Sequence, residues 1–132
     1  MDSKREEMKI LILEDDKLHL NLLEAFLKRM GFKNIIKSES GPEAIRLTKE
    51  HQPDLFFIDI IIQGMTGGEF REHLKNDPMT KDTPVVFISG IISKEEEIKL
   101  GGRLVSGDLI VAKPFSSQRI AEAIDMAFRT SI

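Results

Sequence analysis

The sequence contains no cysteine, no tyrosine and no tryptophan among its 132 residues. The absence of cysteine excludes disulfides, thiolate zinc sites, iron–sulfur clusters and cysteine nucleophiles. No apolar run approaches the roughly 18 residues that a membrane-spanning helix needs. The charged start of the chain, residues 1–7, has no apolar signal core. We therefore expect a cytoplasmic protein with no membrane partner.

Charge of neither sign dominates the chain. It has 19 basic and 22 acidic residues, a net charge of −3, which weighs against direct nucleic-acid binding. Hydrophobic residues make up 41% and charged residues 31%, which is typical of globular proteins. A chain of this length corresponds to one domain with a core of ordinary size. We expect a single domain over residues 1–132.

Five short apolar runs alternate with five amphipathic stretches. The runs, which we expect to be strands, are residues 10–13, 34–37, 55–58, 85–88 and 109–111. The first amphipathic stretch has Leu23, Phe26, Leu27 and Met30 at helical spacing. Strict alternation of strands and helices predicts a parallel sheet with helices on both faces and right-handed crossovers.

Three of the expected helices begin with the Ser/Thr-x-x-Glu spacing of a capping box, at Ser40, Thr66 and Ser93. The paired glycines at 101–102 predict the end of the fourth helix, because glycine disfavours helix interiors. The charged run at 94–97 is expected to form a solvated helix face.

The polar residues that follow the first, third, fourth and fifth runs could form a functional site. Glu14 and Asp15 follow the first run, Asp59 the third, Ser89 the fourth and Lys113 the fifth. The carboxyl ends of parallel strands lie at one edge of a sheet, where ligands of open α/β folds bind. We therefore expect three carboxylates, a hydroxyl and an ammonium group to converge there.

This set of groups favours phosphoryl chemistry around a metal ion. Two carboxylates about 4 Å apart repel by roughly 4 kcal/mol at an effective dielectric constant of 20, so three need a cation. Oxygen ligands without His or Cys favour a hard ion, Mg²⁺ or Mn²⁺. A carboxylate can then act as nucleophile and form an aspartyl phosphate. Asp59 is the strongest candidate, because it ends a wholly apolar strand where an unpaired charge is costly.

Each of these residues has a structural alternative when taken alone. An acidic residue after a strand often caps the next helix, and Asp15 or Asp16 could have that role. His19, His51 and His73 lack metal-ligand spacing and are expected to be solvated. It is less probable that all four strand ends carry such residues by coincidence than that any one of them does.

The motifs together resemble those of a response regulator receiver domain of two-component phosphorelays, from about Met8 to Phe128. The matching segments are residues 10–16, 53–60, 64–67, 85–90 and 113–115. The resemblance implies a doubly wound, flavodoxin-like fold with five parallel strands in the order 2-1-3-4-5 and five helices.

The resemblance also implies roles for the residues at the sheet edge. Asp59 would be the phospho-acceptor. Glu14 and Asp15 would hold Mg²⁺ or Mn²⁺ together with Asp59 and the backbone carbonyl of Ile61. The resemblance alone assigns this set of ligands. It also implies that Asp16 caps the first helix and is not a ligand.

Ser89 would sense the phosphoryl group and Lys113 would pair with it, with a cis Lys113–Pro114 bond. The donor would be a phosphohistidine on a sensor histidine kinase or a histidine phosphotransfer protein. The protein would act on no separate substrate; it would catalyse its own phosphorylation and a slow autodephosphorylation. The fourth helix, fifth strand and fifth helix would contact an unknown downstream protein.

Several positions depart from the family pattern. Gln63 stands where proline is usual, Thr66 where aspartate is frequent and Gly90 where alanine is usual. Ile110 replaces a frequent Tyr or Phe whose ring turns inward on activation, so a ring-flip switch is excluded there. The signal is then expected to pass through the loop after Ser89 or the region of the paired glycines.

Ile61 and Ile91 occupy the positions that tune water access in this family, two residues after the acceptor and two after the hydroxyl. Neither side chain can orient an attacking water molecule. A long-lived aspartyl phosphate is therefore expected.

Other functional classes fit the sequence less well. A flavodoxin-like cofactor-binding domain would need a Ser-, Thr- or Gly-rich loop after the first strand, where acidic residues stand instead. A metal-dependent aspartyl phosphatase resembling the haloacid dehalogenase family would carry Asp-x-Asp there, which residues 14–16 do not match. A degenerate receiver that only binds partners would have lost some of the residues that are all present here.

Overall fold

The computed structural model describes residues 2–62, 64–104 and 107–129 of the chain. Its strands are β1 (Lys9–Leu13), β2 (Asn34–Ser38), β3 (Leu55–Asp59), β4 (Val85–Ser89) and β5 (Leu109–Ala112). Its helices are α1 (Asp2–Glu7), α2 (Lys17–Arg29), α3 (Gly41–His51), α4 (Gly67–Lys75), α5 (Lys94–Lys99) and α6 (Ser117–Arg129). Each expected strand is present, displaced by no more than a residue at either end.

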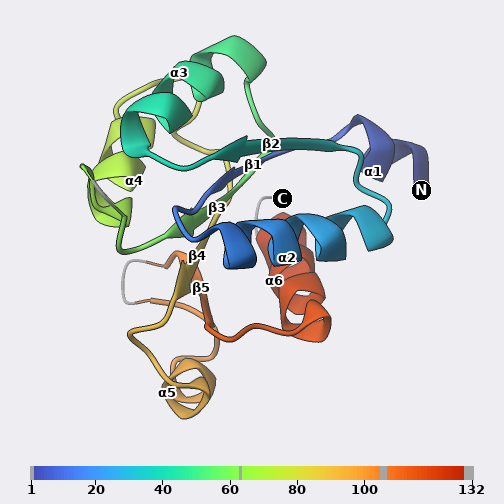
Figure 1. The fold of residues 1–132 in the computed structure, drawn as a ribbon, viewed down its shortest axis with the longest axis vertical. Coiled ribbons are helices and arrows are strands. Elements are labelled where there is room, and N and C mark those ends of the chain that lie inside the picture. The colour runs from blue at the N-terminus through green and yellow to red at the C-terminus, as the bar shows by residue number, and fades with distance from the viewer. Residues whose placement is uncertain (1, 63, 105–106, 130–132) are drawn as a thin grey trace.

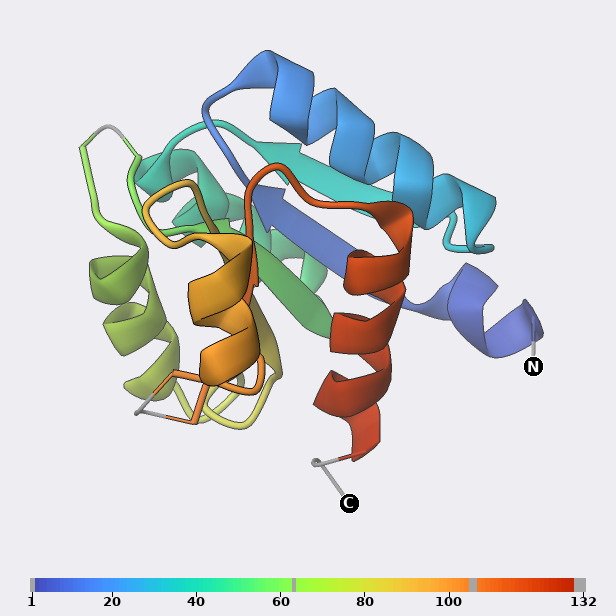
Figure 2. The ribbon, with the colours of Figure 1, turned by 90° about the horizontal axis from the view of Figure 1, so that it is seen from below.

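The five strands form one parallel sheet in the order β2-β1-β3-β4-β5 (Figure 1). This order confirms the doubly wound fold that the resemblance implied. All five carboxyl ends consequently lie along one edge, and Figure 2 shows the loops after β1, β3, β4 and β5 gathered along it. Among residues 2–62, 64–104 and 107–129, no helix has the length and apolarity to cross a membrane.

The sheet has a hydrophobic core on each face, because its three central strands are apolar throughout residues 10–13, 55–58 and 85–88. Ile12 and Phe57 pack against α2 and α6, whereas Leu11 and Phe56 face α3 and α4. The rings of Phe56 and Phe70 meet edge to face with centroids 5.9 Å apart. Figure 1 shows α2 and α6 on one side of the sheet, α3 and α4 on the other, and α5 beside β5. The two layers hold the strand ends in fixed relative positions.

Two of the three capping boxes are complete. The Thr66 and Ser93 hydroxyl groups each accept a hydrogen bond from the backbone N–H three residues later. The glutamate at that later position accepts from the backbone N–H of the capping residue. At Ser40 only the first bond forms, because the Glu43 carboxylate accepts from Glu39 N instead, at 2.9 Å. α5 ends at Lys99, before the paired glycines, as predicted.

A sixth helix, α1, is a correction to the five-helix prediction. Its six residues are polar and carry no apolar periodicity. Tertiary contacts hold it in place. The Arg5 guanidinium donates to Met30 O at 2.6 Å and lies over the Phe32 ring, and Asn34 Nδ2 donates to Glu6 O at 2.9 Å.

Glu97 is a second correction, because it does not belong to a solvated face. Only 3% of this residue is exposed, although Lys94, Glu95 and Glu96 of the same run are exposed. Its position on the inner side of α5 places its carboxylate against β5. The sequence did not indicate this burial, because Glu97 belongs to a run of four charged residues.

Candidate functional site

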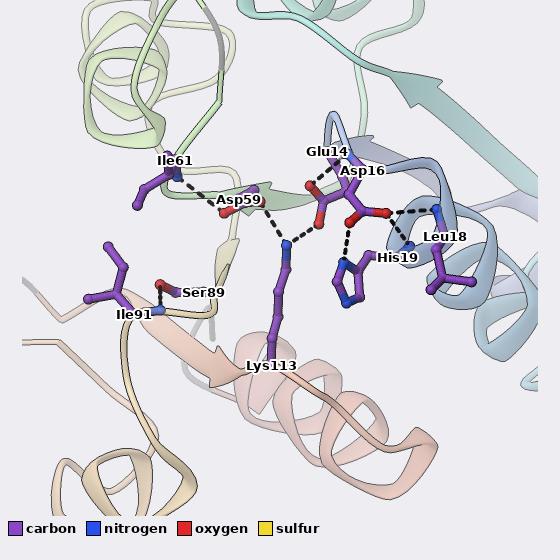
Figure 3. A network of polar contacts seen from close by, with 9 residues as sticks. All are labelled: Glu14, Asp16, Leu18, His19, Asp59, Ile61, Ser89, Ile91 and Lys113. Atoms are coloured by element: carbon purple, nitrogen blue, oxygen red, sulfur yellow. Dashed lines mark hydrogen bonds and ion pairs between the residues drawn. The ribbon is translucent and has the colours of Figure 1, made fainter.

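Side chains from three strand ends meet at the carboxyl edge of the sheet. Glu14 follows β1, Asp59 ends β3 and Lys113 follows β5. β1 and β3 are hydrogen-bonded neighbours in the sheet, so Glu14 and Asp59 lie close together. Figure 3 shows the Lys113 side chain reaching across to both carboxylates. The predicted convergence of these groups is therefore present.

Lys113 joins the two carboxylates. Its Nζ donates to Asp59 Oδ2 at 2.8 Å and forms an ion pair with Glu14 Oε1. Glu14 is completely buried and Asp59 is 6% exposed. Burial lowers the pKa of Lys113, but the hydrogen bonds to Asp59 and Glu14 outweigh it, so the pKa is raised and the ammonium stays charged. A charged lysine thus offsets part of the buried negative charge.

Glu14 is the carboxyl group most perturbed by this crowding. Burial, followed by the hydrogen bond to Asp59, raises its pKa from 4.5 to about 7, although Lys113 opposes the shift. Its Oε2 also accepts from Asp16 N at 3.2 Å. A carboxyl group with this pKa is half protonated near neutral pH, which marks a site where a further cation is favourable.

The donor set fits a hard divalent cation. Glu14, Asp15 and Asp59 each place a carboxylate oxygen within 4.8 Å of the other two. The group offers oxygen only, as Mg²⁺ and Mn²⁺ prefer. Ile61 N donates to Asp59 Oδ1 at 3.1 Å, which fixes the carboxylate at the start of the next loop. The role expected of the Ile61 carbonyl stays a prediction.

Ser89 lies at the same edge, but its hydroxyl makes a local bond. The residue is buried, and its Oγ accepts from Ile91 N at 3.0 Å. Ser89 O accepts from Lys113 N at 2.8 Å, so the loop after β5 is anchored on β4. The Lys113–Pro114 bond is cis, which confirms the prediction from the resemblance.

Asp16 caps α2, as predicted. Its Oδ1 accepts from Leu18 N and His19 N, at 2.9 and 3.3 Å, and these backbone bonds lower the pKa of Asp16. His19 is 27% exposed and not fully solvated as expected, because its Nδ1 lies 3.2 Å from Asp16 Oδ2 and its ring meets Phe115. The i, i+3 spacing of Asp16 and His19 was the available signal for this contact.

The two positions that tune water access in this family lie beside the site. Ile61 and Ile91 are 61% and 62% exposed, beside Asp59 and Ser89 (Figure 3). A Cβ on Gly90 would meet no atom within 4 Å, consistent with extra room there. Ile110 is buried in β5. Gln63 lies outside the described residues.

Comparisons with known proteins agree with this geometry. The family model for the response regulator receiver domain matches residues 10–125. The polar-differentiation response regulator DivK of Brucella ovis is 32% identical over 117 residues, which are 87% of this chain and 91% of that protein.

Solved structures agree as well. The N-terminal domain of a response regulator receiver protein from Methanoculleus marisnigri JR1 is 29% identical, with a TM-score of 0.67 over 91% of this chain and 95% of that one. The chemotaxis protein CheY4 of Vibrio cholerae is 20% identical and shares the fold, with a TM-score of 0.77 over 91% of this chain and 98% of that one. The chain belongs to the family of response regulator receiver domains.

Proposed function

We propose that this receiver domain accepts a phosphoryl group on Asp59 from a phosphohistidine of a partner protein, in a reaction that requires Mg²⁺ or Mn²⁺. The phosphorylated form then changes its contacts with a downstream protein. The observation that carries the proposal is the arrangement around Asp59. This buried carboxylate accepts from Lys113 Nζ at 2.8 Å and shares an all-oxygen cluster with Glu14 and Asp15.

The chemistry follows from these contacts. One Asp59 oxygen attacks phosphorus, the bond from phosphorus to the histidine nitrogen breaks, and the electron pair of that bond remains on the ring. Lys113 would exchange its bond to Asp59 for the phosphoryl oxygens, and Ser89 would release Ile91 N and donate to the same group. A divalent cation, held by Glu14, Asp15, Asp59 and the Ile61 carbonyl, would supply positive charge to the phosphoryl oxygens.

The partner is proposed to be a sensor histidine kinase or a histidine phosphotransfer protein. In this proposal the domain is not an enzyme with a separate substrate, because the group that reacts is its own side chain. A cytoplasmic location also stays a prediction.

Incubation with acetyl phosphate and Mg²⁺, followed by intact-protein mass spectrometry, tests the proposal. We expect a gain of one phosphoryl group when the metal is present and none when it is chelated. A small-molecule donor removes the need to know the kinase. An unmodified protein with abundant Mg²⁺ and donor would contradict the proposal.

The affinity for Mg²⁺ should rise with pH. The proton on Glu14 has to leave before the carboxylate can hold a metal, and its pKa of about 7 puts this competition near neutrality. One proton with this pKa makes binding about tenfold weaker at pH 6 than at pH 8. Isothermal titration calorimetry at both pH values measures the effect, and buffers of different ionisation enthalpy count the released protons.

The matched variant for this prediction is Glu14→Gln. It should bind Mg²⁺ more weakly at both pH values and lose most of the pH dependence. Equal affinity of the unsubstituted protein at pH 6 and pH 8 would contradict the prediction.

Ile61→Asn should shorten the lifetime of the aspartyl phosphate. Ile61 is exposed beside Asp59, where an amide would offer polar atoms to a water molecule that the isoleucine cannot orient. We expect faster hydrolysis, by less than the roughly hundredfold that a well-placed general base supplies. Loss of phosphoryl mass over time gives the rate. Ile61→Leu serves as the apolar control, and equal rates in all three proteins would refute the prediction.

A further inference from the structure

Glu97 is a buried carboxylate that the proposed chemistry leaves without a role. Its Oε1 accepts from Ala112 N at 2.7 Å, at the end of β5. Its Oε2 forms an ion pair with the Arg119 guanidinium in the first turn of α6. One side chain of α5 therefore joins β5 and α6.

Ala112 links this carboxylate to the phosphorylation site through the backbone. It is the register partner of Ser89 on β4, and the next residue, Lys113, donates from its backbone to Ser89 O at 2.8 Å. Lys113 Nζ bonds Asp59. Lys113 consequently connects the Asp59 carboxylate with the adjoining residue of β5, Ala112, whose N–H bonds Glu97.

The negative charge of Glu97 is not needed to satisfy β5. A glutamine of the same shape would accept the hydrogen bond from Ala112 N equally well and would avoid burying a charge. The charge is needed only for Arg119, which is 35% exposed and belongs to another helix. This points to the connection with α6 as the reason for the carboxylate.

The same pair borders a hollow on the surface. A cavity of about 250 Å³ lies between α5, β5 and α6, and Glu97, Ile110 and Arg119 are among its lining residues. The side chain of Ile110 is apolar and has no hydrogen-bonding group that could respond to a change at the phosphorylation site. A change in the Glu97–Arg119 pair would alter this hollow directly.

We propose that the Glu97–Arg119 pair transmits phosphorylation of Asp59 to the surface formed by α5 and α6. The inference rests on the proposed function. Glu97 is a positioning residue, because it touches neither Asp59 nor the incoming phosphoryl group.

Backbone amide chemical shifts test this link, recorded by NMR before and after beryllofluoride and Mg²⁺ are added to the full chain. In the unsubstituted protein we expect changes at residues 59–61 and 89–91, and also at residues 117–121 of α6. Glu97→Gln keeps the acceptor for Ala112 N and removes the charge. It should retain the changes at the site and lose those in α6.

Arg119→Gln is the second variant; it leaves the buried Glu97 carboxylate without its ion-pair partner, so urea denaturation first shows that the variant is folded. It should lose the same α6 response. Glu95→Gln, an exposed carboxylate on the same helix, should respond as the unsubstituted protein does. Slow hydrogen exchange of the Ala112 amide in Glu97→Gln would show that β5 is intact, so that a lost response reflects the missing charge.

The outcomes separate the link from the proposed function. A full α6 response in either Glu97→Gln or Arg119→Gln overturns the link. Changes at the site without any in α6 of the unsubstituted protein also overturn it and leave phosphorylation standing. No change at the site of the unsubstituted protein removes the proposed function, and the link with it.

Discussion

Asp59→Asn should accept no phosphoryl group from acetyl phosphate in the presence of Mg²⁺. The amide keeps an oxygen that can accept from Lys113 Nζ or Ile61 N, so the local hydrogen bonds can persist. It has no anionic oxygen to attack phosphorus, and it removes one of the three carboxylates that would hold the metal. We therefore expect complete loss of the mass increase, without loss of the fold.

Stability distinguishes this loss from misfolding. Asp59 helps to raise the pKa of Glu14, so the neutral amide should relieve repulsion and leave the free energy of unfolding at least as large. Asp82→Asn is the control, because Asp82 is an exposed carboxylate that precedes β4, at the opposite edge of the sheet. It should be phosphorylated normally. Phosphoryl uptake by Asp59→Asn would place the acceptor elsewhere.

Gly67→Ala should destabilise the protein by about 1–3 kcal/mol, the usual cost of overpacking a buried position. A Cβ on Gly67 would lie 2.6 Å from Asp59 O and 2.8 Å from Ile60 Cα. Both are backbone atoms and cannot rotate away. Gly67 N also donates to Ile60 O at 2.8 Å, so α4 begins in direct contact with the end of β3. Urea denaturation measures the loss.

Gly68→Ala is the matched control on the same helix. A Cβ there has only Thr66 Oγ1 nearby, at 3.8 Å, and alanine favours the helix by up to about 1 kcal/mol over glycine. The two variants should therefore shift stability in opposite directions. Gly67→Ala should also slow phosphorylation, because the displaced backbone carries Asp59. Equal unfolding free energies for the two variants would refute the role assigned to this close approach.

The centre of the sheet was predictable from the sequence because β3 and β4 are buried on both faces. Runs such as residues 55–58 and 85–88 are short and wholly apolar, and capping residues mark where the neighbouring helices begin. These two features together predict strands and not helices for the runs. α1 could not be found in this way. Its residues are polar throughout, and its contacts reach Met30, 25 residues further along the chain.

The position of the site in the fold could be predicted from the order of the strands, whereas the individual side-chain contacts could not. Parallel strands put Glu14, Asp59 and Lys113 at one edge whatever the details of packing. Burial of Glu97 depends on how α5 is rotated against β5, and three consecutive glutamates give no indication of which one faces inward. Tertiary contacts determine which of these side chains is buried, and the local sequence pattern does not.

The outer amide hydrogens of β5 are already engaged by the chain itself. Ile110 N donates to Gly102 O at 2.8 Å, and Ala112 N donates to the Glu97 carboxylate. A strand from a neighbouring molecule would have to break both bonds before it could extend the sheet there. At the opposite border, on β2, the charged Lys37 discourages such pairing. The fold thus carries its own protection against fibrous self-association through strand addition.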